Sequence, residues 1–476
     1  MRPCLFREKG RGAFPVPANH NPWQPMTAST PLLHTERLGL RATPDSPFFV
    51  QDVALTIPGG ECHIVSGPTG SGKSTLLQAA AGLLPDACLQ GRIQVADPRP
   101  AVILQNPETQ LLAATIGGEC AFYLENLGWD LEVMQRTVRL ALDGVGLTQS
   151  LSTPTRSLSM GQKYRLLLAA FLAAAPRLLL IDEAGTQLDA PGREHLAVHI
   201  QRHTQNGGSA VLFEQHPGVL ASVADGYWRL ENGTLCAADK PPSAPPLQPN
   251  AAPSPGSTPP LLTCTGLTLA PQGCPPLVQD GDLSLHSGEL VLLTGANGAG
   301  KSTLLQTLAG FGRPQAGRIF FKGQPPRPDQ TRGKIGLVLQ NPERQFFETT
   351  IREEMLFALK RLGIPAPERT RRAQRWLARI GLQDRQEIPP FALSYGQKRL
   401  LALATTLAFA PEVVLLDDPG AGLDTAYQRT ILELLDQERS DNGLGVIWTA
   451  HDMPFTAAEN AYTHIRIQGG RLVRAN

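Results

Sequence analysis

The chain has 476 residues, which is long enough for two or three domains that each bury a sizeable core. Its 43 Lys and Arg against 42 Asp and Glu leave a formal net charge of +1, so no overall basic field exists to attract nucleic acid or an anionic membrane. Seven scattered cysteines without a C-x-x-C pair indicate reduced thiols in a cytosolic protein, and argue against a zinc or iron–sulfur site.

The N-terminal segment mixes basic residues with prolines and lacks a continuous apolar stretch, so it predicts no secretory signal. We expect residues 1–27 to be a disordered extension, and either Met1 or Met26 to be the true start. The longest apolar run, Leu166 to Ala175, is shorter than the ~18 to 20 residues that a membrane-spanning helix needs.

The first predicted strands lie between Thr30 and Ile57, and a third strand, Cys62 to Val65, leads into a glycine-rich loop. A helix from Leu76 to Ala81 follows the loop. The loop matches G-x-x-x-x-G-K-[ST] and consists of Gly67, Pro68, Thr69, Gly70, Ser71, Gly72, Lys73, Ser74 and Thr75. Between a strand and a helix, this pattern predicts a phosphate-binding loop with Lys73 on the β/γ-phosphates and Ser74 on Mg²⁺.

Four shorter motifs follow the loop in chain order. They are a glutamine after an apolar strand (Gln105), an L-S-x-G-Q sequence before a long helix (Ser159, Gly161 and Gln162), two acidic residues after a strand (Asp182 and Glu183) and a late histidine (His216). Each alone carries little information, because a lone carboxylate is usually solvated and a lone histidine is usually structural.

The second half of the chain repeats all of these motifs. Its phosphate loop is Gly295, Ala296, Asn297, Gly298, Ala299, Gly300, Lys301, Ser302 and Thr303. The later motifs are Gln340, then Ser394, Gly396 and Gln397, then Asp417 and Asp418, then His451. The phosphate loops are 228 residues apart and the later motifs 235, so the second half has seven extra residues, which we place around Lys322 to Gly333.

The repeat predicts two domains, at residues 28–236 and 261–476. Residues 237–260 between them hold nine prolines and show no periodicity, which predicts a linker of coil and polyproline II character. The expected fold class is α/β, with two P-loop NTPase domains, each a mixed sheet with a helical subdomain, joined by this Pro-rich linker.

This ordered set of motifs, found twice, resembles the ATP-binding cassette (ABC) ATPases. The resemblance implies that the two cassettes pair head to tail within one chain and hold two ATP molecules, each between one phosphate loop and the L-S-x-G-Q signature of the other cassette. Ser159 and Ser394 are expected at helix N-termini, where a hydroxyl and the helix dipole can meet a γ-phosphate.

The family pattern also implies a role for each remaining motif residue. Catalytic or γ-phosphate-sensing roles fall to Glu183, His216, Gln105, Asp418, His451 and Gln340, and the Mg²⁺ shell to Ser74, Gln105, Asp182, Ser302, Gln340 and Asp417. Both signatures depart from the family by replacing the middle glycine, with Met160 and Tyr395. The adenine-stacking aromatic is not obvious: Phe48 or Phe49 is a candidate in the first half, and the second half offers none.

The residues after each glutamine look like the Q-N-P-x-x-Q segment of energy-coupling-factor ATPases. They read Gln105-Asn106-Pro107-Glu108-Thr109-Gln110 and Gln340-Asn341-Pro342-Glu343-Arg344-Gln345. The resemblance implies an importer of a vitamin or transition-metal ion at the cytoplasmic face of the cell membrane, with a transmembrane coupling subunit and a substrate-binding membrane protein as partners. Leu111-Leu112 and Phe346-Phe347 are the expected apolar contacts for the coupling subunit, although the helices that follow can also be core-packing segments.

Two alternatives are considered beside the importer. One is a soluble tandem cassette ATPase that acts on ribosomes or nucleic acid; the Pro-rich, nearly uncharged linker and the net charge of +1 disfavour it, and we expect no nucleic-acid partner. The other is the ATPase pair of an ordinary ABC importer or exporter, which differs only in its membrane partner.

Overall fold

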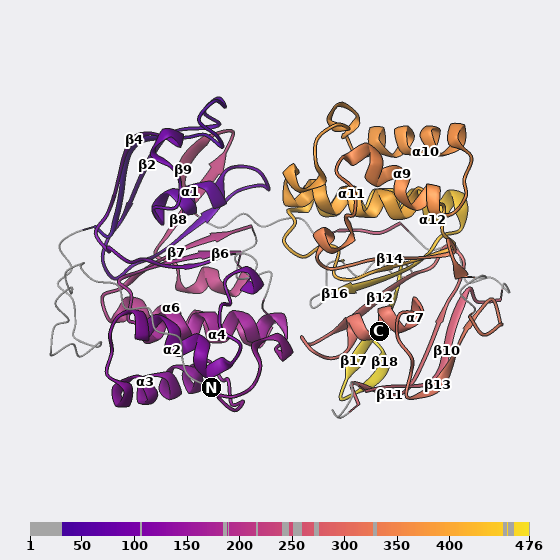
Figure 1. The fold of residues 1–476 in the computed structure, drawn as a ribbon, viewed down its shortest axis with the longest axis horizontal. Helices are drawn as coiled ribbons and strands as arrows, with labels where there is room; N and C mark the ends of the chain where they lie inside the picture. Colours follow the sequence, from indigo (N-terminus) through magenta and orange to yellow (C-terminus); the bar gives the residue numbers. More distant parts are fainter. Residues whose placement is uncertain are drawn as a thin grey trace, which may run out of the picture.

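A computed structural model describes residues 31–104, 107–183, 188, 190–215, 218–239, 247–250, 259–270, 276–326, 331–450, 455 and 461–475. Figure 1 shows two similar α/β bodies side by side, one from each half of the chain. Each body contains a three-stranded antiparallel sheet and a six-stranded, mostly parallel sheet. The predicted fold class is confirmed.

In the first half, the parallel sheet has the strand order β5-β6-β7-β3-β8-β9, with β9 antiparallel. Its strands are β3 (Cys62–Ser66), β5 (Ala101–Ile103), β6 (Leu178–Asp182), β7 (Ser209–Glu214), β8 (Gly226–Glu231) and β9 (Thr234–Ala238). Every residue of β3, β6 and β7 is buried, as expected for strands of a parallel sheet covered on both faces. The antiparallel sheet consists of β1 (Leu33–Leu40), β2 (Val50–Ile57) and β4 (Leu89–Val95).

Two layers pack on this parallel sheet. One face carries α1 (Lys73–Ala80) and the antiparallel sheet, and their apolar side chains form one core. A second core joins the other face to the helices α2 (Ile116–Asn126), α3 (Leu131–Gly144), α4 (Met160–Ala173) and α6 (Ala190–Gln205). Helices α2 to α4 form the helical subdomain.

The second half repeats this arrangement with the order β14-β15-β16-β12-β17-β18. These strands are β12 (Leu290–Gly295), β14 (Ile335–Val338), β15 (Val413–Leu416), β16 (Gly445–Ala450), β17 (Thr463–Gln468) and β18 (Arg471–Arg474). The antiparallel sheet is β10 (Leu262–Leu269), β11 (Val278–Leu285) and β13 (Ala316–Phe321). The helices are α7 (Lys301–Leu308), α9 (Ile351–Arg361), α10 (Ala366–Arg379), α11 (Tyr395–Leu407) and α12 (Thr425–Asn442).

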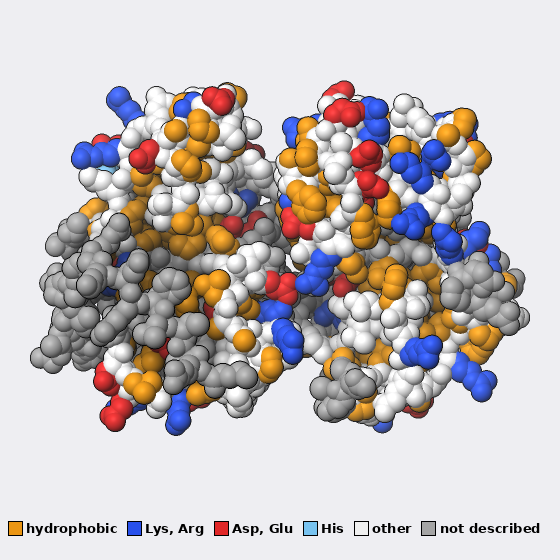
Figure 2. Space-filling model, viewed as in Figure 1, with side chains coloured by type: hydrophobic (Ala, Val, Ile, Leu, Met, Phe, Trp, Pro, Cys, Tyr) orange, Lys and Arg blue, Asp and Glu red, His pale blue; other side chains and the backbone are white. Residues whose placement is uncertain are grey.

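The two halves lie in inverted orientation. In Figure 1 the helical subdomain of the first half is at the bottom left, whereas α9, α10 and α11 of the second half are at the top right. Figure 2 shows acidic and basic side chains gathered along the junction of the two bodies. Among the described residues, no helix combines the length and the apolar character needed to cross a membrane.

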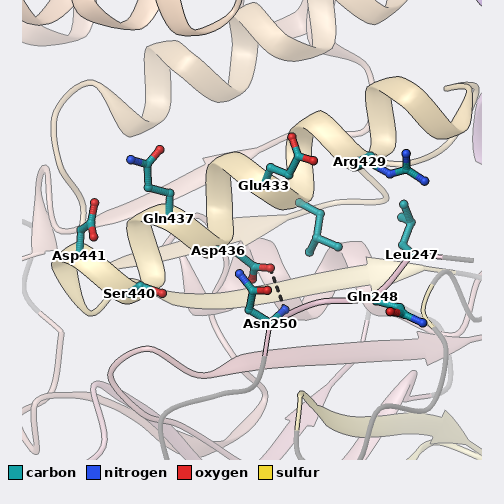
Figure 3. A pocket seen from close by; sticks show the side chains of 10 residues that line it. Leu247, Gln248, Asn250, Arg429, Glu433, Asp436, Gln437, Ser440 and Asp441 are labelled. Atoms are coloured by element: carbon teal, nitrogen blue, oxygen red, sulfur yellow. Dashed lines mark hydrogen bonds between the residues drawn. The ribbon is translucent and has the colours of Figure 1, made fainter.

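Part of the predicted linker is attached to the second half. Leu247 is only 3% exposed and belongs to the core of the second helical subdomain, and it forms a parallel bridge with Phe455. The backbone N–H of Asn250 donates to Asp436 Oδ2 at 2.8 Å. Figure 3 shows this segment beside α12, where the two line a cavity of about 640 Å³. Residues 240–246 and 251–258, which hold most of the linker prolines, lie outside the described residues.

We expect Leu247→Ala to destabilise the protein by about 2 kcal/mol or more, because it truncates a buried leucine. Thermal unfolding of the purified chain would show a lower Tm. The neighbouring exposed Gln248, changed to Ala, is the matched control and should leave Tm nearly unchanged. Equal Tm values for the two variants would contradict the anchoring of this segment.

Candidate functional site

The first phosphate loop joins the end of β3 to the start of α1. Gly70 and Gly72 have φ angles of 83° and 104°, which residues with a side chain rarely adopt, and no Cβ fits at Gly67 because it would lie 2.2 Å from the Leu230 carbonyl oxygen. The loop therefore has the backbone shape that a phosphate cradle requires. Lys73 is 4% exposed, and its Nζ donates to the carbonyl oxygens of Gly67 at 2.8 Å and Pro68 at 3.1 Å.

The hydroxyl of Ser74 donates to Asp182 Oδ2 at 2.8 Å. Asp182 is the last residue of β6, so the loop and this strand end meet at the carboxyl edge of the sheet. Burial raises the pKa of Asp182, and the hydrogen bond from Ser74 opposes that shift. Burial also lowers the pKa of Lys73, against the attraction of the nearby carboxylates.

Glu183 follows Asp182 in a left-handed backbone conformation, with φ at 51°. Its backbone N–H still donates to the Phe213 carbonyl at 2.8 Å, so its position is tied to β7. The Glu183 carboxylate accepts a 2.7 Å hydrogen bond from Gln215. Glu183 thus stands beside the hydroxyl–carboxylate pair, where a base for an attacking water is expected.

The second half forms the same arrangement. Lys301 Nζ donates to the Gly295 carbonyl at 2.6 Å, and the Ser302 hydroxyl donates to Asp417 Oδ1 at 3.0 Å. Asp418 has a φ of 45°, matching Glu183, and its backbone N–H donates to the Thr449 hydroxyl at 2.9 Å. Burial raises the pKa of Asp417, and the Ser302 hydrogen bond acts in the opposite direction.

The signature serines begin α4 and α11, as expected. Ser159 and Ser394 are the N-caps, and each forms a reciprocal capping box with the glutamine three residues later, Gln162 or Gln397. A Cβ on Gly396 would lie 2.9 Å from the Tyr427 ring, so the glycine permits close packing of α11 against α12. Pairing of each signature with the opposite phosphate loop stays a prediction.

The Q-N-P-x-x-Q segments have a structural explanation. Gln110 accepts from the Leu104 backbone N–H at 2.8 Å and donates to the Val102 carbonyl at 2.9 Å, which folds the segment back onto the end of β5. Glu108 accepts from Lys163 at 2.5 Å, one residue past the signature. In the second half, Gln345 and the pair Lys398–Glu343 repeat these contacts. The segment therefore links the strand end to the signature helix.

A buried glutamate shapes the loop after each segment. Glu119 accepts from the backbone N–H groups of Leu112 and Ala113, and Glu354 accepts from those of Phe347 and Glu348. Burial raises the pKa of Glu354, against these backbone hydrogen bonds.

The exposure of the side chains in this loop corrects part of the predicted apolar contact surface. Leu112 is 70% exposed and Phe347 69%, whereas Phe346 is buried in the helical core of the second half and Leu111 packs against the helical core of the first half. Each expected apolar pair thus has one side chain facing solvent and one facing inward. The outward ring of Phe347 stacks on Phe357 with centroids 5.0 Å apart.

The two halves contact each other close to the first phosphate loop. The Thr69 backbone N–H donates to Asp424 Oδ2 at 2.7 Å, and Asp424 is the N-cap of α12 in the second half. Farther away, Arg344 donates to Glu108 Oε2 at 3.0 Å. The Lys163 ammonium holds the pKa of Glu108 below its ordinary value, and Arg344 adds to that shift.

Several predicted site residues lie outside the described residues: Gln105, His216 and His451. Gln340 is described, is half-buried and follows β14. The remaining predicted residues occupy the two loops, strand ends and helix N-termini given above, and the structure brings Lys73, Ser74, Asp182 and Glu183 together at one edge.

The base-binding positions differ between the halves. The Phe49 ring is close to the first phosphate loop, because a Cβ on Gly72 would lie 2.9 Å from it, and Phe49 is partly exposed. At the equivalent place in the second half, a Cβ on Gly300 would meet Leu277. A cavity of about 650 Å³ lies beside that second loop, lined in part by Leu277, Gly295 and Arg466.

Sequence reasoning missed three residues that differ between the sites. Tyr164, Glu214 and Gln215 are buried in the first half. The 235-residue offset places Arg399 at the position of Tyr164, and the strand register places Ala450 at the position of Glu214. Comparing the two halves position by position would have identified all three. The contact of Asp424 with the opposite phosphate loop was also missed, because it joins residues 355 apart in the chain.

The residues present fit ATP and Mg²⁺. A glycine loop at a helix N-terminus with a buried lysine suits a polyphosphate, and a hydroxyl beside a carboxylate supplies the oxygen ligands that Mg²⁺ prefers. This fold and these two sites define a P-loop ATPase with two nucleotide-binding cassettes.

The comparison with known families gives the same class. The family profile described as "ABC transporter" matches residues 50–186 and again residues 278–421. The chain belongs to the ABC transporter family of ATP-binding proteins. It is an ATPase subunit of a transporter, and its cassettes bind ATP.

Similar proteins span nearly the whole chain. YkoD of Bacillus subtilis (strain 168), provisionally named an HMP/thiamine import ATP-binding protein, is 30% identical over 91% of this chain and 89% of its own length. A provisionally named ABC transporter ATP-binding protein of Methanosarcina acetivorans is 28% identical over 89% of this chain and 86% of its own. The solved structure of cbiO1 from Clostridium perfringens, described as part of the ABC transporter complex cbiONQ, matches 45% of this chain and 87% of that one, with 28% identity and a TM-score of 0.41.

The two sites are expected to hydrolyse ATP at different rates. Asp418 stands where the first site has Glu183, and its carboxylate is set back by one methylene. Misplacing a catalytic group by ~1 Å costs on the order of 10²-fold in rate. We therefore expect Glu183→Gln to remove nearly all ATPase activity and Asp418→Asn to remove little, as measured by steady-state phosphate release. Comparable losses in the two variants would refute the asymmetry.

Proposed function

We propose that this chain is the ATP-hydrolysing subunit of an energy-coupling-factor type importer of a vitamin or transition-metal ion, bound at the cytoplasmic face of the membrane. The carrying observation is one solvent-facing apolar side chain, Leu112 or Phe347, in the loop after each Q-N-P-x-x-Q segment. The provisional name of the B. subtilis relative, which describes import of HMP/thiamine, supports the uptake direction and the substrate class.

In this proposal each cassette prepares its own phosphate site. Lys73 and Lys301 exchange their loop carbonyl partners for phosphate oxygens, and Ser74 with Asp182, like Ser302 with Asp417, holds Mg²⁺, which supplies charge neutralisation when bound. Glu183 orients and deprotonates the attacking water. Gln340 would contact the metal shell or the γ-phosphate, and Ser159 and Ser394 would complete the site of the opposite cassette. The resemblance gives the same role as Gln340 to Gln105, His216 and His451, which lie outside the described residues.

The loop after each segment is the proposed contact for a transmembrane coupling subunit. A buried glutamate fixes the loop backbone, so Leu112 and Phe347 are held in solvent by the fold. Exposed apolar side chains in a defined loop suit a partner helix that buries them. The same segment reaches the signature helix through Lys163–Glu108 and Lys398–Glu343, so force on the loop is transmitted to the nucleotide sites.

Replacing both phosphate-loop lysines tests the ATPase assignment of the two sites. Lys73→Ala combined with Lys301→Ala should abolish ATP hydrolysis and transport in the reconstituted complex, because neither phosphate loop then has a lysine to face the phosphates. The paired control is Lys360→Ala, which removes an exposed lysine on α9. Full turnover in the double variant would rule out the assignment.

Polar substitution of the exposed apolar pair tests the docking surface. Leu112→Ser with Phe347→Ser should weaken binding of the membrane subunit by about 10²-fold, since each buried apolar side chain contributes ~1.5 to 3 kcal/mol and 1.4 kcal/mol is tenfold. ATP binding by the free chain should not change.

The matched control for this test is Leu140→Ser with Val473→Ser, which removes one exposed apolar side chain from each half away from these loops. Co-purification from membranes and equilibrium binding in detergent report the effect. An undiminished complex with full transport in the Leu112/Phe347 variant would count against the surface. Co-purification with ribosomes in place of a membrane subunit would favour the soluble alternative.

A further inference from the structure

We propose that Gln215 is a positioning residue that holds the Glu183 carboxylate and makes its placement depend on the docked second cassette. Gln215 directly follows β7, the strand next to β6, and its side chain is 5% exposed. The inference rests on the proposed role of Glu183 as the base of the first site.

Three acceptors surround the Gln215 amide nitrogen. Nε2 lies 2.7 Å from Glu183 Oε1, 3.1 Å from the Thr69 hydroxyl and 3.4 Å from the Gly422 carbonyl oxygen. A carboxylate and a carbonyl can only accept, so the NH₂ end of the amide must face them. Among the described residues Oε1 has no hydrogen-bond partner, and the side chain is therefore held through its NH₂ end.

The shortest of these three contacts is the one from Gln215 to the Glu183 carboxylate. A hydrogen bond to a buried carboxylate is about twice as strong as one between neutral groups. Because both side chains are buried, the bond restricts the Glu183 rotamer. Loss of the bond would let the carboxylate move by an ångström or more, which is enough to lower the rate of a general base.

The third acceptor belongs to the other half of the chain. Gly422 lies two residues before Asp424, whose carboxylate accepts from the Thr69 backbone N–H. The segment 422–424 of the second cassette therefore contacts Gln215 and the first phosphate loop at the same place. Separation of the cassettes would break both contacts at once, and Gln215 would lose one of the acceptors that orient it.

In the second half, Ala450 pairs with Thr294 as Glu214 pairs with Ser66, so the position that corresponds to Gln215 is His451, which lies outside the described residues. The backbone N–H of Asp418 donates there to the Thr449 hydroxyl. At the Glu183 site, the dependence on docking gives the chain a physical reason to hydrolyse ATP only when the second cassette is in place.

The test uses the full chain in the Asp418→Asn background, where the remaining turnover reports the first site. Gln215→Met keeps the side-chain volume without a donor, and Gln215→Asn keeps the amide but withdraws it by one methylene. We expect both to lower kcat by about 10- to 10²-fold with KM for ATP changed less than twofold. If Gln215 had only a packing role, the variants would lower Tm but would not lower kcat while leaving KM nearly unchanged.

Coupling to the second cassette is measured with Asp424→Ser, which can still cap α12 but is too short to reach Thr69. If Gln215 acts together with segment 422–424, the fall in kcat for Gln215→Met with Asp424→Ser is smaller than the product of the single effects. Independent, multiplying effects would overturn the coupling.

Glu183→Gln in the same background distinguishes a failure of the positioning role of Gln215 from a failure of Glu183 as the base. If it abolishes turnover while Gln215→Met and Gln215→Asn retain it, the positioning role is wrong and the proposed function stands. If Glu183→Gln itself retains turnover, the proposed base is wrong, and the role of Gln215 fails with it.

Discussion

The contact between a phosphate-loop serine and a strand-end aspartate organises both halves of this protein. Ser74 meets Asp182 at 2.8 Å and Ser302 meets Asp417 at 3.0 Å, although more than 100 residues separate the partners in each pair. The contact exists because the strands that carry them are parallel and fully buried, so their carboxyl ends share one edge of the sheet. The cores above and below the sheet hold that edge in place.

The loops that follow the Q-N-P-x-x-Q segments depend on the same edge. The second glutamine of each segment binds the end of β5 or β14, and the glutamate before it pairs with a lysine just past the signature. Nucleotide site, signature helix and exposed apolar residue are thereby joined by short polar contacts. This connection gives the proposed transport function a mechanical basis.

The two sites share a backbone but differ in buried charge. In the second half burial raises the pKa of Asp417, the Ser302 hydrogen bond opposes that shift most, and the buried Arg399 guanidinium adds a smaller opposing effect. In the first half the equivalent position is Tyr164, whose pKa is raised well above its ordinary value by burial, with smaller contributions from Glu214 and Asp182. The second half therefore has a buried guanidinium near its strand-end carboxylate, whereas the first half has a tyrosine at that position and adds a buried carboxylate, Glu214, and a buried amide, Gln215. The asymmetry inferred from Glu183 and Asp418 thus extends into the surroundings of both residues.

The sequence by itself determined the two phosphate loops, the strands before them, the strand-end carboxylates and the helices that begin at Ser159 and Ser394. These features are local patterns of glycine, apolar runs and capping residues, and their repetition made each one unambiguous. Only the tertiary structure decided which of Leu111 and Leu112, or of Phe346 and Phe347, faces solvent, because adjacent residues in an irregular loop follow no period. It alone also showed Gln215 against Glu183 and Gly422, and Thr69 against Asp424. Such contacts join residues far apart in the chain, and the packing of whole cassettes, which no local pattern encodes, brings them together.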